Sequence, residues 1–459
     1  MIYAAQPALC LRGVATPIRN RGGKNMSENS YRFETKRIHS GYVPADNNDS
    51  VNVPIYQTAS FNFRDIDRAQ RLLRGVEVAS VYSRVTNPTV AALEERVRDL
   101  DGGAAALAVA SGMAAITNTL LFLAEGGGTI VHASSLYGGT QEALVNFLGR
   151  FGVETRPVVN RQDPAAYEAL IDDSTRAVYL ESFSNPNGEI YDFEAIAEIA
   201  HRHGVPLVVD NTVATSYLFQ PFEHGADIAV YSLTKGLGGH GNLIGGVVVE
   251  RGGFHYAPYR FPQFYAKSYK IRDIDGNPRS PLDFSTDFPV VAALRLFYLE
   301  FLGAALGPFD AYLALQGMST LVERLDKQVA TTVKLVKFLE GRPEVAWVRH
   351  PSATGSPYGA LAEKYFPHGA PALFAFGFNG NREQLKAFFG ALKLFSYHVN
   401  LGDVRSLIVN SPETTHGEFT PELLEQADIP TNLVRISVGL ENANDLIADL
   451  AQAFDAVFQ

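Results

Sequence analysis

Hydrophobic and polar residues follow two alternating patterns between residues 104 and 250. Short apolar runs predict buried strands, and the segments between them carry apolar residues at helical spacing. This alternation is typical of a mostly parallel sheet covered by helices on both faces, with functional residues at the carboxyl ends of the strands. Strands are expected at 105–110, 129–132, 153–159, 177–181, 206–210, 228–232 and 246–250, with helices such as 113–123 and 193–203 between them.

The alternation stops after residue 250. Residues 251–290 are rich in Tyr, Phe, Pro and Arg and predict an irregular excursion that serves as a lid or an interface. A helical stretch over 309–339 then leads into a smaller α+β region. The strands of that region are expected at 345–348, 373–378, 406–409 and 433–438.

Four segments follow from these patterns. Residues 1–30 form a leader that is expected to be disordered, and residues 31–100 form an extended arm followed by a helix over 88–100. A large α/β domain covers 101–300, and a C-terminal domain covers 301–459. The first 27 residues hold four basic residues and no acid, which fits a transit peptide. They also fit an unstructured leader, or a start assigned upstream of Met26, and composition favours these two interpretations over a transit peptide.

Composition narrows the class of protein. The chain has 459 residues, of which 46 % are apolar and 19 % charged, as in ordinary globular proteins. A net charge of −10 argues against a nucleic-acid partner, and no apolar run approaches the roughly 20 residues of a membrane span. The single cysteine, Cys10, excludes an internal disulfide and a cysteine-rich metal site. We therefore expect a cytoplasmic protein without a metal.

One lysine stands in an unusual position. Lys235 directly follows a strand predicted to be buried, between the hydroxyl residues Ser232 and Thr234 and a glycine-rich run over 236–241. A second predicted strand ends in Asp210. A lysine and an acid at strand ends of an α/β sheet suit pyridoxal phosphate, because the lysine holds the aldehyde as a Schiff base and the acid keeps the pyridine nitrogen protonated. Lys235 is therefore the first candidate for a catalytic residue.

Three further segments follow predicted strands. Gly112 and Met113 open a helix after Ser111, and free amides at a helix start suit a phosphate, although serine is also a common helix cap. Tyr137 has the flat ring needed to stack on a cofactor, or else it packs in a turn. Asn185 precedes a proline, so it either bonds a cofactor oxygen or marks a turn.

Two other patterns are weaker. Residues 236–241 match the dinucleotide fingerprint G-x-G-x-x-G, but they lead into the strand at 246–250 instead of a helix, which disfavours a dehydrogenase. His201 and His203 lie two positions apart on a predicted helix, so they cannot share a face and are expected to be solvated.

The chain resembles the pyridoxal-phosphate enzymes of Cys/Met metabolism from about Thr35 to its C-terminus. The resemblance implies the aspartate-aminotransferase-like fold (fold type I) and pyridoxal 5'-phosphate as cofactor. It rests on residues 82–89, 110–114, 210–212 and 232–235 with 239–241. Within the family, the chain most resembles the O-acetylhomoserine sulfhydrylases (aminocarboxypropyltransferases). This closer resemblance rests on residues 53–58, 302–309, 315–317, 392–396 and 400–403.

The resemblance also implies roles for single residues. Lys235 would be the Schiff-base lysine, Asp210 would pair with the ring nitrogen, and Tyr137 would stack on the ring and shuttle a proton. Asn185 would contact the phenolic oxygen, and Arg435 would bind the substrate carboxylate, as arginine favours. Further cofactor contacts are implied for Gly112, Met113, Thr212, Ser232 and Thr234, with Tyr82 and Arg84 from a neighbouring subunit, and further substrate contacts for Tyr56 and Asn400.

The implied reaction is γ-replacement on O-acetylhomoserine. Sulfide or methanethiol would replace the acetyl group and give homocysteine or methionine with acetate, in a homotetramer built of catalytic dimers. A cystathionine γ-synthase, which uses cysteine, and a γ- or β-lyase remain alternatives. Gly139 stands where methionine γ-lyases have a cysteine, which argues against that lyase activity.

One segment departs from the family pattern. Residues 410–413 read Asn-Ser-Pro-Glu, where the family usually has His-Pro-Ala-Ser. Glu413 either faces the acyl pocket, where it would repel an anionic succinyl group, or is a solvated loop residue without a role.

Overall fold

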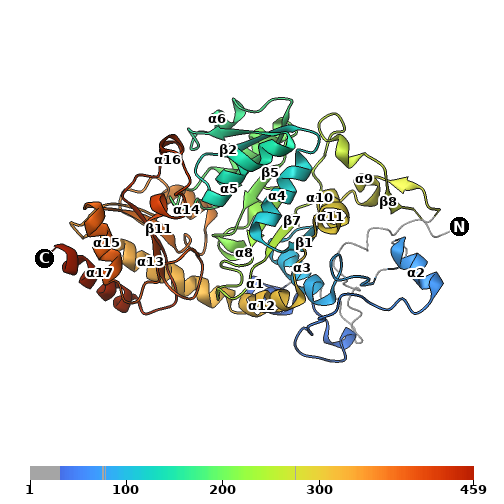
Figure 1. Cartoon of the computed structure of the whole chain (residues 1–459), viewed down its shortest axis with the longest axis horizontal. Helices are drawn as coiled ribbons and strands as arrows, with labels where there is room; N and C mark the ends of the chain where they lie inside the picture. The colour runs from blue at the N-terminus through green and yellow to red at the C-terminus, as the bar shows by residue number, and fades with distance from the viewer. Residues whose placement is uncertain (1–30, 75–76, 78, 274, 459) are drawn as a thin grey trace.

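The computed structural model describes residues 31–74, 77, 79–273 and 275–458. The expected leader at 1–30 therefore lies outside the described residues. Figure 1 shows a large sheet in the middle of the molecule with helices on both sides, and a smaller C-terminal part beside it, coloured orange to red. The boundaries placed at residues 30, 100 and 300 stay predictions.

The large sheet has seven strands in the order β1-β7-β6-β5-β4-β2-β3. All pairs are parallel except those of β7, which runs antiparallel to both β1 and β6. The mostly parallel sheet predicted from the sequence is confirmed. Its strands are buried on both faces, as parallel sheets require, except the edge strand β3, in which Glu154 and Pro157 are exposed. The strands are β1 (Ala105–Val109), β2 (Gly128–Ala133), β3 (Val153–Val158), β4 (Thr175–Glu181), β5 (Leu207–Asp210), β6 (Ile228–Ser232) and β7 (Gly246–Glu250).

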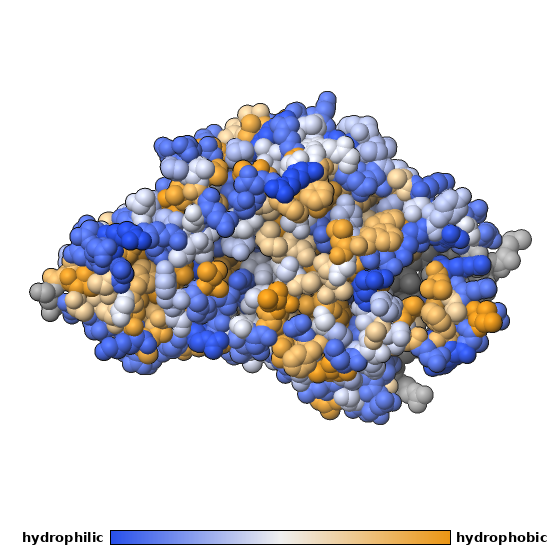
Figure 2. All heavy atoms as spheres, in the orientation of Figure 1, coloured by the Kyte–Doolittle hydropathy of each residue, from blue (hydrophilic) through white to orange (hydrophobic). Residues whose placement is uncertain are grey.

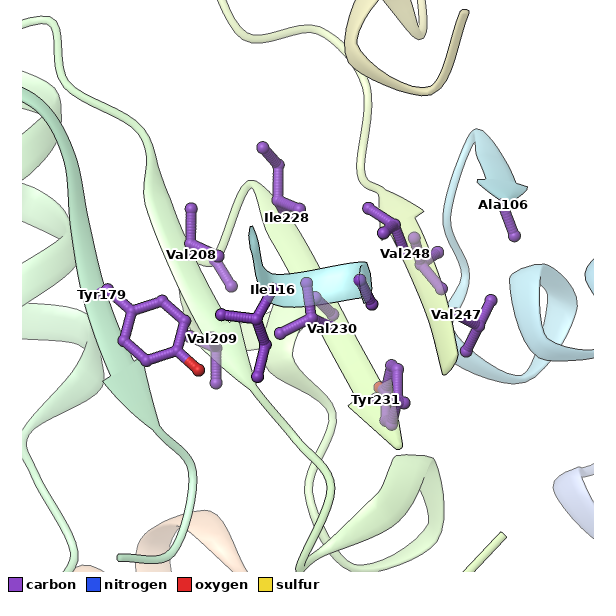
Figure 3. Close-up of a cluster of buried hydrophobic side chains, with 14 of the residues drawn as sticks. Ala106, Ile116, Tyr179, Val208, Val209, Ile228, Val230, Tyr231, Val247 and Val248 are labelled. Atoms are coloured by element: carbon purple, nitrogen blue, oxygen red, sulfur yellow. The ribbon is translucent and has the colours of Figure 1, made fainter. Parts of the chain in front are cut away.

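Helices cover the sheet through apolar contacts. Figure 3 shows Ile116, which belongs to α4, beside Val209 of β5 and Val230 of β6, in one cluster of buried side chains. The α-helices between residues 31 and 302 are α1 (Phe33–His39), α2 (Ile66–Leu73), α3 (Pro88–Asp101), α4 (Gly112–Leu123), α5 (Gly138–Glu142), α6 (Pro164–Glu168), α7 (Phe193–Arg202), α8 (Thr215–Leu218), α9 (Pro281–Phe284), α10 (Pro289–Ala293) and α11 (Glu300–Leu302).

The C-terminal part has its own antiparallel sheet, in the order β10-β11-β13-β12. Aromatic side chains of β11 pack against the last helix, and Phe376 and Phe454 belong to one core cluster. The strands are β10 (Val345–Arg349), β11 (Leu373–Phe378), β12 (Leu407–Val409) and β13 (Leu433–Ser437). The helices are α12 (Pro308–Met318), α13 (Leu321–Glu340), α14 (Gly359–Tyr365), α15 (Arg382–Ala391), α16 (Pro421–Gln426) and α17 (Ala443–Phe458).

The helical stretch expected at 309–339 is two helices, α12 and α13. Ser319 and Thr320 lie between them, and their hydroxyls donate to the carbonyls of Gln316 (2.6 Å) and Gly317 (3.3 Å). Such bonds compete with the helical backbone pattern. Gly317 also packs so closely on the backbone of Gly238 that a side chain would not fit there. The break therefore follows from local hydroxyl bonds and a tertiary contact.

The excursion at 251–290 is partly regular. It contains the hairpin β8 (Ser268–Arg272) and β9 (Pro278–Arg279) and the helix α9. Its aromatic residues reach the core, where the rings of Phe264 and Phe122 lie 4.8 Å apart. Phe122 is near the end of α4, and a helix of this length spans about 18 Å. No described residue of 251–290 lines the candidate site cavity described below. The role of the excursion as a lid or an interface stays a prediction.

Among the described residues, no helix is both long and apolar enough to cross a membrane.

Candidate active site

A cavity of about 220 Å³ lies at the carboxyl ends of β4, β5 and β6, beside the start of α4. The small sheet closes it from the other side, since β13 and the loop before β12 contribute to its lining. All site residues predicted from the sequence line this cavity except Tyr56, Tyr82 and Arg84. Those that line it are Gly112, Met113, Tyr137, Asn185, Asp210, Thr212, Ser232, Thr234, Lys235, Asn400 and Arg435.

Lys235 lies just past the end of β6, with its amine in the cavity lining. Its Nζ donates a hydrogen bond to Oδ1 of Asn400 at 2.7 Å. Burial and the nearby charge of Arg435 lower the pKa of Lys235 to about 8, although Asp403 acts in the opposite direction. A lysine with a lowered pKa supplies a neutral amine, the form needed for a Schiff base or a general base.

Asp210 ends β5 and is buried. Its Oδ2 accepts a hydrogen bond from the hydroxyl of Tyr179 at 3.2 Å, and its Oδ1 accepts one from the backbone N–H of Thr212 at 2.9 Å. Burial raises the pKa of Asp210, while the bonds from Thr212 and Tyr179 oppose that rise. A buried carboxylate at this place suits a buried cation, such as a protonated ring nitrogen.

The start of α4 provides a site for an anion. The side chain of Ser111 caps the helix by accepting from the N–H of Ala114. Gly112 lies so close to β6 that an added Cβ would be 2.7 Å from Cβ of Ser232, so only glycine fits. Free N–H groups of the first helical turn, with the hydroxyls of Ser232 and Thr234 in the same lining, favour a phosphate.

Arg435 crosses from β13 into the cavity. Its Nη1 donates to Oδ1 of Asn185 at 3.0 Å, and its Nη2 donates to the carbonyl of Asn400 at 2.8 Å. Burial lowers the pKa of Arg435 to about 10, so the guanidinium stays charged at neutral pH. Its Nε is buried and has no hydrogen-bond partner among the described residues. A buried cation with a free donor fits an anionic group such as a carboxylate.

Tyr137 also lines the cavity and is 36 % exposed. Burial raises the pKa of its hydroxyl, although the charge of Arg435 opposes the rise. The hydroxyl therefore stays protonated at neutral pH and is available as a donor. A side chain at Gly139 would have its Cβ 2.7 Å from the Tyr137 ring, so residue 139 borders the same part of the site.

Three predicted residues lie outside the cavity of their own chain. Tyr82 and Arg84 are on the N-terminal arm, where Arg84 forms a 3.4 Å contact with Glu300 and lies over the Tyr82 ring. The side chain of Arg84 is 43 % exposed. The hydroxyl of Tyr56 donates to Oδ1 of Asn47 at 3.1 Å. A single chain thus does not bring these residues to the site.

Glu413 does not face the cavity. Its carboxylate forms a two-point ion pair with Arg382 of α15, with N–O distances of 2.8 Å and 3.0 Å, and its side chain is 42 % exposed. The hypothesis that it faces the acyl pocket is therefore wrong. Glu413 is a partly exposed loop residue, and its lack of a role stays a prediction. Arg382 is 31 residues away in the sequence, so the pattern around residue 413 gave no sign of it.

His201 of α7 and His203, which directly follows that helix, are paired rather than simply solvated. His201 lies 2.8 Å from Asp227, and His203 lies 3.1 Å from Glu168, so they do bind separate partners, as their spacing required.

Sequence reasoning missed two residues of the site. Glu181 ends β4 and lines the cavity beside Asp210, and Tyr179 binds Asp210 from the same strand. The signal was available for Glu181, because it is an acid at the carboxyl end of a predicted strand, as Asp210 is. No such signal existed for Tyr179, whose position inside an apolar strand is typical of a core residue.

The cavity as a whole fits pyridoxal phosphate. It combines a lysine amine, a buried carboxylate and an anion site at a helix start, which match the aldehyde, the ring nitrogen and the phosphate of that cofactor. No group of His, Cys, Asp and Glu suited to a metal ion occurs in the part of the chain that the structure describes.

Comparisons with known proteins agree with this chemistry. The family of Cys/Met metabolism PLP-dependent enzymes matches residues 34–455. The homocysteine synthase of Schizosaccharomyces pombe is 40 % identical, and the aligned region covers 94 % of this chain and 100 % of that protein. The O-acetyl-L-homoserine sulfhydrylase of Leptospira meyeri is 38 % identical, with 94 % of this chain and 98 % of that protein covered.

The fold is also shared with a solved structure from Campylobacter jejuni, described as an O-acetylhomoserine (thiol)-lyase with N'-pyridoxyl-lysine-5'-monophosphate. It superimposes with a TM-score of 0.87 at 36 % identity, and the match covers 93 % of this chain and 100 % of that one. The protein is therefore a member of the Cys/Met metabolism family of pyridoxal-phosphate-dependent enzymes.

Proposed function

We propose that this protein catalyses γ-replacement on O-acetylhomoserine, with sulfide or methanethiol as nucleophile and homocysteine or methionine with acetate as products. The main support for this proposal is that Lys235, Asp210 and Arg435 line one cavity. A second support is the similarity of this chain, over nearly its full length, to a homocysteine synthase and an O-acetyl-L-homoserine sulfhydrylase. Cystathionine γ-synthase and γ- or β-lyase activities are the alternatives.

In this proposal each side chain has a separate task. Bound pyridoxal phosphate supplies an electron sink that makes the Cα–H bond of the substrate acidic. Lys235 takes the Cα proton as a neutral amine, which its pKa of about 8 permits. Asp210 holds the proton on the ring nitrogen, and Arg435 orients the substrate through its carboxylate. Tyr137 is the candidate donor for a proton at the departing acetate.

The test is an assay of the purified protein with O-acetylhomoserine and O-succinylhomoserine, each with sulfide, methanethiol or cysteine. The proposal expects release of acetate and formation of homocysteine or methionine. Cystathionine as the main product would identify a cystathionine γ-synthase. Ammonia and a keto acid, released without a nucleophile, would identify a lyase and overturn the proposal.

We further propose a homotetramer built of catalytic dimers, working in the cytoplasm without a nucleic-acid or membrane partner. The net charge of −10 supports the absence of a nucleic-acid partner. The exposed arm residue Arg84 lies beside Glu300, and Phe301 and Leu302 next to it are 69 % and 61 % exposed. Figure 2 shows hydrophobic surface over the region of α10 and α11. Such a patch beside an arm supports a subunit interface there.

Replacing Lys235 with alanine is expected to abolish turnover. The loss should be at least about 10²–10⁴-fold, the usual contribution of one general base, because the covalent link to the cofactor disappears as well. The visible absorbance of the lysine-linked cofactor should vanish, while the thermal melting curve stays close to that of the wild type. Lys334→Ala, on an exposed position of α13, is the control and should keep both signals. An unchanged absorbance in the Lys235 variant would show that another lysine binds the cofactor.

Asp210→Asn should bind the cofactor but lose catalysis. A neutral amide does not keep the ring nitrogen protonated, and removing one preorganised electrostatic partner typically costs about 10²–10³ in kcat. The measurement is exchange of the substrate's α-proton with deuterated solvent, followed by NMR. Asp227→Asn is the matched control, because Asp227 is also buried but precedes β6 at the opposite edge of the sheet. Near-normal exchange in the Asp210 variant would contradict the assignment.

Glu413→Ser should leave the choice of acyl donor unchanged. Its carboxylate is committed to Arg382 at the surface, and an exposed pair of this kind contributes only about 0–1 kcal/mol. The measurement is the ratio of kcat/KM for O-acetylhomoserine to that for O-succinylhomoserine in both proteins. A large change in this ratio would mean that Glu413 does reach the acyl group during catalysis.

Tyr82 and Arg84 are proposed to complete the phosphate site of the partner subunit, since they lie outside the cavity of their own chain. Mixing Arg84→Ala with Lys235→Ala subunits under exchange conditions should then restore activity. In a random mixture of symmetric dimers, half of the dimers are mixed and hold one intact site each, so recovery should approach about a quarter of the wild-type activity.

The control for this experiment mixes Lys235→Ala with the double variant that carries both substitutions. That mixture has no intact lysine in any subunit, so it should stay inactive. Absence of recovery in the first mixture, with subunit exchange shown by mass spectrometry, would mean that each chain builds its site alone.

A further inference from the structure

Glu181 is a buried carboxyl group that the proposed chemistry does not use. It ends β4 and lies in register with Asp210 at the end of β5. Both residues line the cavity, and the exposed fraction of Glu181 is only 3 %. Burial and the neighbouring charge of Asp210 raise the pKa of Glu181 well above its usual range. Burying a second carboxyl group beside Asp210 therefore costs free energy, which the contacts of Glu181 must offset.

The two oxygens of Glu181 bind two different segments. Oε1 accepts a hydrogen bond from the backbone N–H of Tyr137 at 2.5 Å, and Oε2 accepts one from the backbone N–H of Asn185 at 2.9 Å. Tyr137 lies between β2 and α5, whereas Asn185 follows β4. Glu181 thus joins the loop that carries the candidate ring-stacking residue to the loop that carries the candidate phenolic contact.

The connection continues to the substrate side. Oδ1 of Asn185 accepts from Nη1 of Arg435 at 3.0 Å, and Arg435 is held on its other nitrogen by the carbonyl of Asn400. The position of Asn185 therefore affects the position of the guanidinium. Because Arg435 has a second anchor at Asn400, the effect of Glu181 should be larger at Tyr137 and Asn185 than at Arg435.

A carboxyl group is the side chain that suits this arrangement. It offers two acceptor oxygens, one for each backbone N–H. Glutamine has nearly the same shape, but its amide has one acceptor oxygen and an NH₂ group. That NH₂ group would meet one of the two N–H donors, and the buried donor would lose its partner.

We propose that Glu181 is a positioning residue that fixes Tyr137 and Asn185, and through Asn185 also Arg435, around the pyridoxal phosphate ring. The effect on turnover rests on the proposed function, whereas the effect on the bound cofactor does not. Glu181 itself makes no bond to the reacting atoms in this account. Its substitution is expected to change the geometry of the site more than the stability of the fold.

The test compares Glu181→Gln with Glu250→Gln. Glu250 is likewise buried, with 2 % exposed, and it accepts a hydrogen bond from the backbone N–H of Val291 at 2.9 Å. Burial raises the pKa of Glu250 to about 8. It pairs with Ile228 at the start of β6, which places it at the edge of the sheet opposite the cavity. The backbone N–H of Val290 also binds Glu250, so each variant changes a buried carboxyl group that serves two backbone donors, in different places of the fold.

The first readout is the visible circular dichroism of the bound cofactor without substrate, because it reports how the ring is held. We expect Glu181→Gln to change this band and Glu250→Gln to leave it unchanged. The second readout is kinetic. Misplacing groups that orient a reacting centre by about 1 Å costs up to about 10²-fold, so kcat of Glu181→Gln should fall by about 10–100-fold, with a smaller change in KM. Both variants should show a lowered melting temperature.

An unchanged circular dichroism band together with kcat/KM near the wild-type value in Glu181→Gln would reduce Glu181 to a structural residue and overturn the proposal. If that variant does not fold, Glu181→Asp takes its place. Aspartate keeps the carboxyl group but is one methylene shorter, so it cannot reach both amides, and a wild-type band in it would equally overturn the proposal. A wild-type protein that turns over no acyl-homoserine would refute the proposed function, while the circular dichroism comparison would still decide the role of Glu181.

Discussion

The parallel pairing of β4, β5 and β6 is the constraint on which the rest of the site depends. Parallel strands end at the same edge of a sheet, and their pairing in register places Glu181 beside Asp210. The chain after β6 then brings Lys235 to the same edge. The strands themselves are fixed by their apolar side chains, which are buried on both faces, so the charged residues have no freedom to move with respect to one another.

Burial then determines what these charges can do. The same low-polarity surroundings lower the pKa of Lys235 and raise that of Asp210, because each shift favours the neutral form. A protonated ring nitrogen beside Asp210 would favour the ionised form of that carboxylate and so lower its pKa. A cofactor with a cationic ring and an anionic phosphate fits both the buried carboxylate of Asp210 and the anion site at the start of α4.

The site also depends on parts of the molecule that are distant in the sequence. Arg435 and Asn400 come from the small antiparallel sheet and the loop beside it, and they close the cavity over the end of the large sheet. The two parts are connected directly by the hydrogen bonds that Lys235 donates to Asn400 and that Arg435 donates to Asn185. A change in how the two sheets pack would therefore move Asn400 and Arg435 away from their partners Lys235 and Asn185 together.

The sequence by itself determined the strands, the helices on them and the main chemical groups. Periodicity is a local property, so the strand that ends in Asp210 and the strand before Lys235 were predictable from neighbouring residues. What only the tertiary structure decided were contacts between residues far apart in the chain. The pairing of Glu413 with Arg382, the closeness of Gly317 to Gly238 and the two bonds of Glu181 have no local pattern, because each depends on which segments the fold brings together.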